Sequence, residues 1–455
     1  MKPRLALGVC CLALAFTLAI RATLSAASPE APAPAAVESA ECDGVASCDA
    51  VARGRLAFHD RDLLGLDGNG RSCADCHVPR DNFQLSPAEA DRRFKLLQLR
   101  RQADPTADDP LFRPIDADDF HVNGNDASDY SNLRENGLVR ITFPLPANLK
   151  LIDPATNAPS GELSVDVWRS VPTVNDVALT GSEGVNVWPR GPNQTGGYQL
   201  DARFGTLQEQ ANGAFVTHAQ TRNAVPQALL DDLAAFQSTL FTNPRVRALA
   251  EAVEAGVVPL PDPDLPLSVL QEQGKAVFVR ACAQCHGGVS QTNSPMLPVP
   301  IVRYHDIQSQ CPRAVDAGNR FSFDACPERL ARNARTYEIT LPAQFGGAKI
   351  RRTSSDPGRA LITGFVGGPP PFDDWNKLDM PALRGISKTA PYFHNNSADS
   401  LEDVVDHYIE FFKLVKVGLP PGAPIPPIAT TDGLTFNRAP LPEERAALLA
   451  YLKKL

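Results

Sequence analysis

Two cysteine pairs, each followed at once by a histidine, carry the most specific chemistry in this sequence. They are Cys73-Ala-Asp-Cys76-His77 and Cys282-Ala-Gln-Cys285-His286. In the C-x-x-C-H form, two thiols three positions apart can reach the two vinyl groups of one porphyrin, and the histidine can reach its iron. Composition alone would give ~0.004 such motifs in the chain, so two of them predict covalent attachment of two c-type haems.

Zinc coordination and thiol redox chemistry are the alternatives for cysteine pairs of this spacing. A zinc ion with four cysteine ligands would have to join pairs that lie 209 residues apart. Neither a zinc site nor a thioredoxin-like pair explains why a histidine follows both pairs. Haem attachment explains both histidines.

Four further cysteines, Cys42, Cys48, Cys311 and Cys326, lie outside these motifs. Four cysteines allow three pairings, and the sequence cannot fix which one forms. Nearness favours Cys42 with Cys48 and Cys311 with Cys326, each closing a short loop. We expect a structural role for them.

The N-terminus has the features of an export signal. Lys2 and Arg4 precede an apolar run over 5–20, and small residues follow it up to Ala27. The run is shorter than the ~20 residues that cross a bilayer, and no second apolar run follows. We therefore expect residues 1–27 to be a cleaved signal peptide, a mature protein without a membrane span, and a periplasmic location.

Composition excludes several other classes of protein. The chain has 455 residues, 41 of them proline, and a formal net charge of −8. This length can bury the core of more than one domain. No cluster of lysine and arginine follows the pattern that tracks a phosphate backbone, so nucleic acid is not an expected partner.

An internal repeat relates the two halves of the chain. Gly54 stands before the first haem motif as Gly274 stands before the second, and Pro172 and Pro381 are 209 residues apart, like the motifs themselves. We therefore expect a mainly α fold with two tandem cytochrome c-type haem domains and long loops. The expected domains are an N-terminal one over 28–256, with the His77 haem, and a C-terminal one over 257–455, with the His286 haem.

The repeat also predicts a difference between the two haems. After Pro172 and Pro381, the offset between matching residues of the two halves changes from 209 to 194 residues. This offset aligns Tyr408 of the second half with Ala214 of the first. Apolar spacing over 401–408 turns Tyr408 to the buried face of a helix. Tyrosine can ligate ferric haem iron and alanine cannot. His407 and Met380 remain alternative ligands. One haem with six ligands and one with an open side are therefore expected.

The chain resembles the bacterial di-haem cytochrome c peroxidase superfamily, and within it the MauG-like branch. The resemblance depends on both haem motifs and on Thr389-Ala-Pro-Tyr-Phe-His394 with the segment that ends at Tyr408. In the family, the sixth ligand of the second haem lies fourteen residues after the histidine of this motif. Peroxidases have methionine there and MauG-like enzymes have tyrosine, so the resemblance also implies Tyr408.

The resemblance further implies residues around the open haem. The family has a glutamine at the place of Gln210 and a glutamate at the place of Gln220 that assists cleavage of the peroxide bond. Because an amide cannot shuttle a proton, the missing glutamate leaves His218 as the candidate acid or base. A calcium ion between the haems would be held by Asn175 and by the carbonyls of Thr389 and Pro391.

As function, the resemblance implies an exported oxidoreductase that uses hydrogen peroxide at the His77 haem and takes electrons through the His286 haem. Its partner would be a small redox protein, cytochrome c or cupredoxin, or a protein or organic substrate. A di-haem electron carrier without catalysis is the alternative. An oxygenase of polymeric hydrocarbons is a third, which no feature of this sequence selects.

Overall fold

The computed structural model describes most of the chain from Cys48 onward. The described residues are 48–63, 65–113, 130–180, 198–283, 286–289, 291, 333–367, 374–376, 378–379, 381–417 and 442–455. The predicted signal peptide, Cys285, Met380 and the side chains of the four cysteines outside the haem motifs lie outside this part. Within it, no helix is long and apolar enough to cross a membrane.

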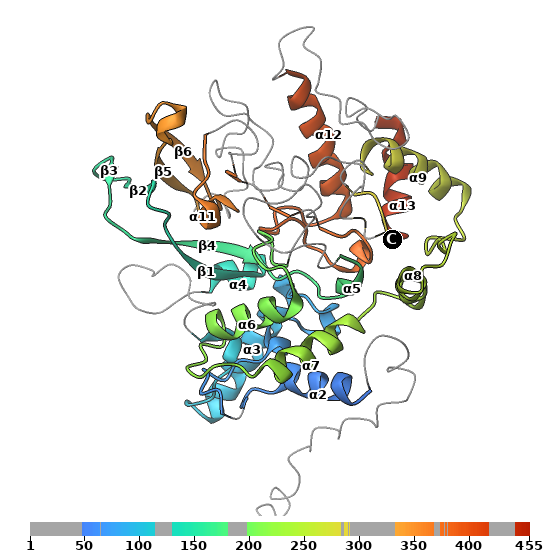
Figure 1. Ribbon diagram of the computed structural model, residues 1–455, viewed down its shortest axis with the longest axis horizontal. Helices are drawn as coiled ribbons and strands as arrows, with labels where there is room; N and C mark the ends of the chain where they lie inside the picture. The colour runs from blue at the N-terminus through green and yellow to red at the C-terminus, as the bar shows by residue number, and fades with distance from the viewer. Residues whose placement is uncertain are drawn as a thin grey trace, which may run out of the picture. The chain divides into compact units, whose positions relative to one another are not determined.

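Helices predominate, which confirms the mainly α prediction (Figure 1). The α-helices are α2 (Cys48–His59), α3 (Pro87–Ala103), α4 (Ser131–Asn136), α5 (Val177–Thr180), α6 (Leu207–Thr217), α7 (Gln227–Ser238), α8 (Pro244–Glu254), α9 (Val269–Ala281), α11 (Ala360–Thr363), α12 (Leu401–Val417) and α13 (Arg445–Leu452). The 3-10 turns are η2 (Cys73–Asp75), η3 (Pro79–Asp81), η4 (Pro110–Phe112), η7 (Ala343–Phe345), η8 (Ile386–Lys388) and η9 (Pro442–Glu444). The strands are β1 (Leu138–Pro144), β2 (Leu149–Asp153), β3 (Ala158–Pro159), β4 (Ser164–Ser170), β5 (Arg335–Thr340) and β6 (Lys349–Ser354).

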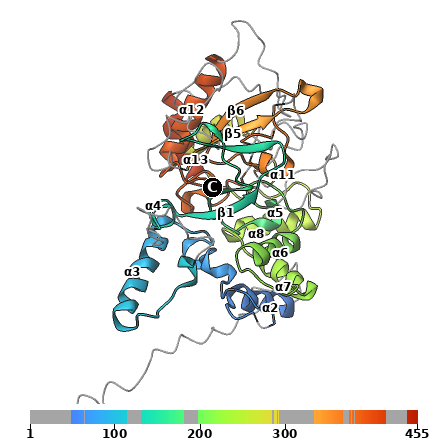
Figure 2. The same cartoon turned by 90° about the vertical axis from the view of Figure 1, so that its left-hand side faces the viewer.

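One pair of packed helices occurs in each half of the chain. Helix α2 packs against α7 (Figure 2), and helix α9 packs against α13 (Figure 1). A Cβ atom on Gly54 of α2 would lie 1.9 Å from the carbonyl oxygen of Asp232, and one on Gly274 of α9 would lie 1.9 Å from that of Ala447. Only glycine permits this close approach, so the two predicted repeats share one helix-crossing geometry.

Aromatic contacts follow the same repeat. Phe58 of α2 lies 5.3 Å from Phe236 of α7, between ring centroids, and Phe278 of α9 lies 5.3 Å from Tyr451 of α13. Each pair is buried in the hydrophobic cluster of its own half. Each crossing joins the helix before a haem motif to the closing helix of that half.

The 194-residue offset between the two halves is also visible in the backbone. An isolated bridge pairs Tyr198 with Phe204, and another pairs Tyr392 with Ala398, at the same shift of 194 residues. Helix α6 begins three residues after the first bridge, and α12 begins three residues after the second. The helices that carry Ala214 and Tyr408 are therefore equivalent, as the repeat predicts.

Two antiparallel sheets were not part of the predicted fold. Strands β1 and β4 form one, and the other has the order β3-β2-β5-β6. Strand β2 pairs with β5 through Leu149 and Ile339, so this sheet joins segments on both sides of residue 256. Packing groups all residues from Cys42 onward as one compact unit. The boundary between the two predicted domains stays a prediction.

A buried ion network also links distant segments. Arg169 of β4 donates through Nε and Nη2 to Asp356, at 2.6 and 3.0 Å, and through Nη1 to Asp201, at 2.6 Å. All three side chains are at most 2% exposed. Burial alone would raise the pKa of Asp356, but the Arg169 guanidinium lowers it below its usual range. The arginine thereby joins β4 to the segments before α6 and after β6.

Candidate haem sites

The first haem motif forms a short turn that fixes its histidine. Ser72 precedes the 3-10 turn η2, and the amide of His77 donates to the carbonyl of Cys73 at 2.8 Å. The Nδ1 atom of His77 lies 3.1 Å from the carbonyl oxygen of Phe83. Because a carbonyl can only accept, Nδ1 carries the proton and Nε2 keeps its lone pair. This is the form of histidine that binds iron.

Burial controls the protonation of His77. The pKa of the imidazole is lowered to about 4, chiefly by burial and in smaller part by the nearby His218, while the carbonyls of Phe83 and Pro172 act in the opposite direction. Burial also raises the pKa of the Cys73 thiol to about 12. The first motif therefore presents a neutral imidazole beside a neutral thiol.

A cavity opens over this motif. Its wall includes Cys73, Cys76 and His77 of the motif, and Gln210, Ala214 and His218 of the α6 segment. Much of the remaining lining is apolar and includes Phe58, Val139, Ile141, Val174, Leu207 and Phe215. An apolar lining with a few polar groups is typical of sites that bind a largely apolar cofactor.

Helix α6 brings the predicted distal residues to this cavity. Gln210, Ala214 and His218 are four residues apart and so lie along one helix face. The Thr206 hydroxyl caps the start of the helix by accepting from the amide of Glu209 at 3.1 Å. At the other end, the amide of His218 donates to the carbonyl of Ala214 at 2.8 Å. The structure therefore gathers both predicted catalytic side chains at the His77 cavity.

Gln220 lies elsewhere. Its backbone has φ 51° and its side chain is exposed, with Oε1 accepting from Nδ2 of Asn69 at 3.2 Å. It is not part of the cavity lining. Of the predicted distal residues that line the cavity, His218 is the one whose side chain can serve as an acid or base.

The second haem motif repeats the arrangement of its histidine. His286 is 5% exposed, and its Nδ1 lies 3.2 Å from the carbonyl oxygens of both Gln291 and Pro381. Burial lowers its pKa to about 4. Pro381 is the repeat of Pro172, whose carbonyl acts on His77. Both histidines thus have the same proton-bearing nitrogen and the same unprotonated one.

Tyr408 lies in the core of the second half. Its side chain is half-buried on α12, and it packs against the same hydrophobic cluster as Cys282. Its ring centroid is 6.3 Å from that of Phe393 and 5.4 Å from that of His407. Tyr408 and His407 both belong to this region, so the choice of axial ligand between them stays a prediction.

The donor sets fit two haems. At each motif an imidazole has Nδ1 near backbone carbonyl oxygens, at 3.1 Å in His77 and 3.2 Å in His286, which leaves Nε2 for an iron. At the first motif, both cysteines line a cavity that is largely apolar. Cys73, Cys76 and His77 would hold one haem. Cys282 and His286 would hold the other, together with the predicted Cys285, which lies outside the described residues.

The predicted calcium ligands lie around the loop that contains Asn82. Nδ2 of Asn175 lies 3.4 Å from the carbonyl oxygen of Asn82, and Nδ2 of Asn82 donates to the carbonyl of Lys388 at 3.0 Å. The segment with Asn175 and the one with Thr389 and Pro391 thus both approach this loop. In the described part of the chain, no three His, Cys, Asp or Glu side chains form a metal-binding group. The calcium site stays a prediction.

Several cavity residues had no signal in the sequence that singled them out. Arg71 is 2% exposed and lines the cavity, where its Nη1 donates to the carbonyl of His218 at 3.3 Å. Its place directly before Ser72 of the motif is the only clue. Tyr198, Gln199 and Gln237 also line the cavity, and they come from segments remote in sequence.

Comparison with known proteins gives only remote likenesses. No family model and no curated protein matches the chain. Among solved structures, a MauG-like protein associated with microbial copper homeostasis is similar with 19% identity and a TM-score of 0.42, over 91% of this chain and 90% of that chain. The diheme peroxidase BthA from Burkholderia thailandensis has 17% identity and a TM-score of 0.40, over 90% and 86%. Kuenenia stuttgartiensis hydrazine synthase has 14% identity and a TM-score of 0.39, over the whole of both chains.

Likeness at this level assigns no activity or substrate to this chain. The functional assignment therefore depends on the haem motifs and on the cavity over His77.

Proposed function

We propose that this chain is an exported di-haem c-type oxidoreductase of the peroxidase type, which uses hydrogen peroxide at the His77 haem. Electrons would pass through the His286 haem, from a small redox protein or from a protein or organic substrate. The observation that carries the proposal is the cavity over His77, where Gln210, Ala214 and His218 of the α6 segment line the same space as the attachment motif.

A haem bound at this motif supplies an iron that can react with peroxide. The protein's part would be to leave space and to move a proton. The methyl group of Ala214 leaves room where the repeat has Tyr408 in the other half. The Gln210 amide can donate a hydrogen bond to a small oxygen ligand, and the His218 imidazole can accept a proton and return it.

The same geometry favours catalysis over simple electron transfer. An electron carrier needs both irons closed by protein ligands. At this cavity, the α6 residues Gln210 and Ala214 offer an amide and a methyl group. An amide and a methyl group are poor iron ligands. The neighbouring His218 is therefore the residue to examine if both irons prove closed.

The test is a spin-state spectrum of the protein as purified, before and after hydrogen peroxide. We expect one high-spin and one low-spin ferric haem, with peroxide changing the high-spin signal. Two low-spin haems that do not react with peroxide would refute the proposal.

Substitution at Tyr408 tests whether this residue ligates the low-spin haem while the other haem stays open. Tyr408→Phe should change the low-spin signal and leave the high-spin signal in place. Tyr392→Phe is the matched control, because Tyr392 belongs to the same cluster but its hydroxyl donates to the carbonyl of Ile386 at 2.9 Å. A low-spin signal changed by His407→Gln and not by Tyr408→Phe would assign the ligand to His407.

A further inference from the structure

A buried carboxylate lies inside the first haem motif. Asp75, between the two cysteines, is 2% exposed. Its Oδ2 accepts from the amide of Ser72 at 2.9 Å, from the Ser72 hydroxyl at 3.1 Å and from Nε of Arg61 at 3.1 Å. Several donors around one carboxylate stabilise its charged form, so the motif contains a fixed negative charge.

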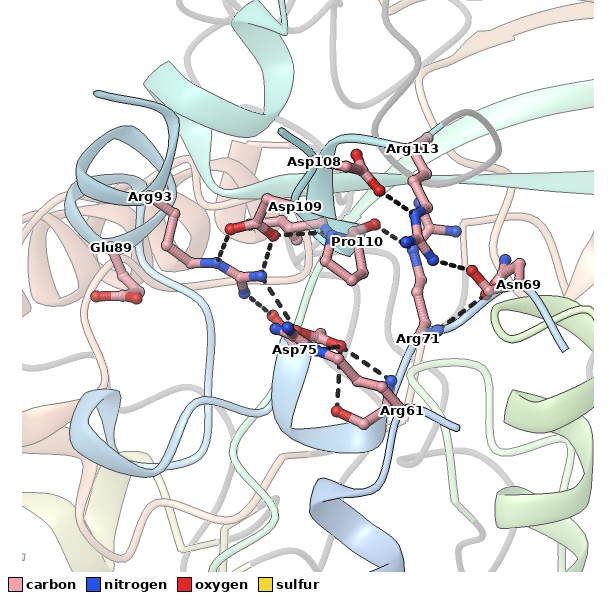
Figure 3. A network of polar contacts seen from close by, with 12 residues as sticks. Arg61, Asn69, Arg71, Asp75, Glu89, Arg93, Asp108, Asp109, Pro110 and Arg113 are labelled. Carbon is pink, nitrogen blue, oxygen red and sulfur yellow. Dashed lines mark hydrogen bonds and ion pairs between the residues drawn. The ribbon is translucent and has the colours of Figure 1, made fainter. Parts of the chain in front are cut away.

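Arg61 contacts both oxygens of this carboxylate, and helix α3 supplies a second, more deeply buried countercharge. Arg93 donates through Nη2 to Oδ1 of Asp75 at 3.1 Å, and its Nη1 donates to the backbone carbonyl of the same residue. It also forms a two-point contact with Asp109 (Figure 3). The Arg93 side chain is 8% exposed, whereas that of Arg61 is 53% exposed. Water therefore screens the charge of Arg61 far more than that of Arg93.

The cluster joins opposite charges. Asp75 and Asp109 carry two negative charges, Arg61 and Arg93 carry two positive ones (Figure 3), and the exposed Arg100 lies 3.9 Å from Asp109. Removal of Asp75 or Arg93 changes the charge at a place that is largely shielded from solvent. Charges in such a site act over longer distances than surface charges, because the local dielectric constant is low.

The second motif has no carboxylate at the matching place. The shift of 209 residues that relates the two motifs pairs Asp75 with Gln284. A carboxylate and an amide have similar shapes but differ by one unit of charge. The two attachment motifs therefore differ in charge at a position that is next to a cysteine in both.

We propose that Asp75, held by Arg93, lowers the reduction potential of the haem at Cys73 and Cys76. A buried negative charge stabilises the oxidised iron, which carries one more positive charge than the reduced iron. Arg93 holds the carboxylate in place and offsets part of its field. This inference rests on the proposed function, since it requires a haem at the first motif.

The experiment is a spectroelectrochemical titration of the full holoprotein that follows each haem separately. Asp75→Asn should raise the midpoint potential of the first haem, because it removes one negative charge. Arg93→Gln should lower it, because it leaves the two carboxylates with the more exposed Arg61 and Arg100. Arg61→Gln should lower it by less than Arg93→Gln does, because the Arg61 side chain is half exposed. The haem at the second motif should keep its potential in all three variants.

Asp75→Glu separates charge from packing. It keeps the negative charge, so its midpoint potential should stay nearer to wild type than that of Asp75→Asn. If Arg93→Gln does not yield folded protein, the comparison of Asp75→Asn with Asp75→Glu still decides. An unchanged or lowered potential in Asp75→Asn would overturn the inference, and so would equal shifts in the Asn and Glu variants.

Failure of the proposed function has a different signature. Mass spectrometry of the wild-type chain would then show fewer than two attached haems, or peroxide would leave both haems unchanged. Two attached haems, with one that reacts with peroxide but does not respond to Asp75→Asn, would refute only the role of the cluster.

Discussion

Alanine at the two helix-crossing glycines should destabilise the two halves of the molecule separately. The new methyl group in Gly54→Ala would lie 1.9 Å from the carbonyl oxygen of Asp232, and in Gly274→Ala 1.9 Å from that of Ala447. Side-chain Cβ atoms essentially never come within 3.0 Å of another heavy atom, so each helix must move by about 1 Å. The facing atoms are backbone, and no rotamer change can relieve the contact.

The expected cost follows from two opposing effects. Overpacking of a tight interior typically costs about 1–3 kcal/mol, and a backbone contact belongs at the upper end. Alanine regains about 1 kcal/mol over glycine inside a helix. The net loss is then about 1–2 kcal/mol, or about 2–8 °C in Tm for a unit of this size.

Thermal unfolding recorded at the absorption band of each haem is the assay. Gly54→Ala should lower the transition of the first haem, and Gly274→Ala that of the second. Leu56→Ala in α2 and Val269→Ala in α9 are controls, since these side chains are 66% and 73% exposed and should change stability by no more than about 0.5 kcal/mol. A Gly54→Ala protein as stable as wild type would show that the crossing is looser than described.

Three further predictions concern the open cavity and the buried ion network. Ala214→Tyr introduces a tyrosine at the position of the first half that matches Tyr408, so the high-spin signal and its response to peroxide should both disappear. Persistence of either would contradict the equivalence of positions 214 and 408. Arg169→Leu leaves the carboxylates of Asp201 and Asp356 buried without their shared partner, and urea denaturation should show a loss of about 3–5 kcal/mol. The pKa of Asp356 is lower in the folded state than in the unfolded state, so the ionised carboxylate stabilises the fold above the usual aspartate pKa near 4. This stabilisation is lost as the pH falls through the folded-state pKa. The Tm of the wild type should therefore fall on acidification, and the Tm of Arg169→Leu should fall less.

The residues that sequence reasoning located share a local pattern. The haem motifs are short, and their spacing follows from the chemistry of one porphyrin. Gln210 and His218 lie on one helix at an i, i+8 spacing, so a helix in the predicted place brings both to the same face. The repeat then supplied the equivalence of Ala214 and Tyr408, which helices α6 and α12 bear out in their starting positions.

The features that the sequence did not predict depend on long-range pairing. Strands β2 and β5 are only five and six residues long, and they pair across more than 180 positions. Short alternating segments of this kind do not reveal their partners. Arg93 gave no signal either, because it reaches Asp75 only once α3 has folded back over the first motif.

Divergence between the two repeats is concentrated where a haem would contact the chain. The helix crossings are kept, since Gly54 and Gly274 make the same close approach to their partner helices. Two of the positions that differ, Ala214 against Tyr408 and Asp75 against Gln284, lie near the expected cofactors. A duplication that retained its packing and changed side chains next to its cofactors would give two haems with different ligands and different potentials. Such a difference is what allows one site to accept electrons while the other reacts.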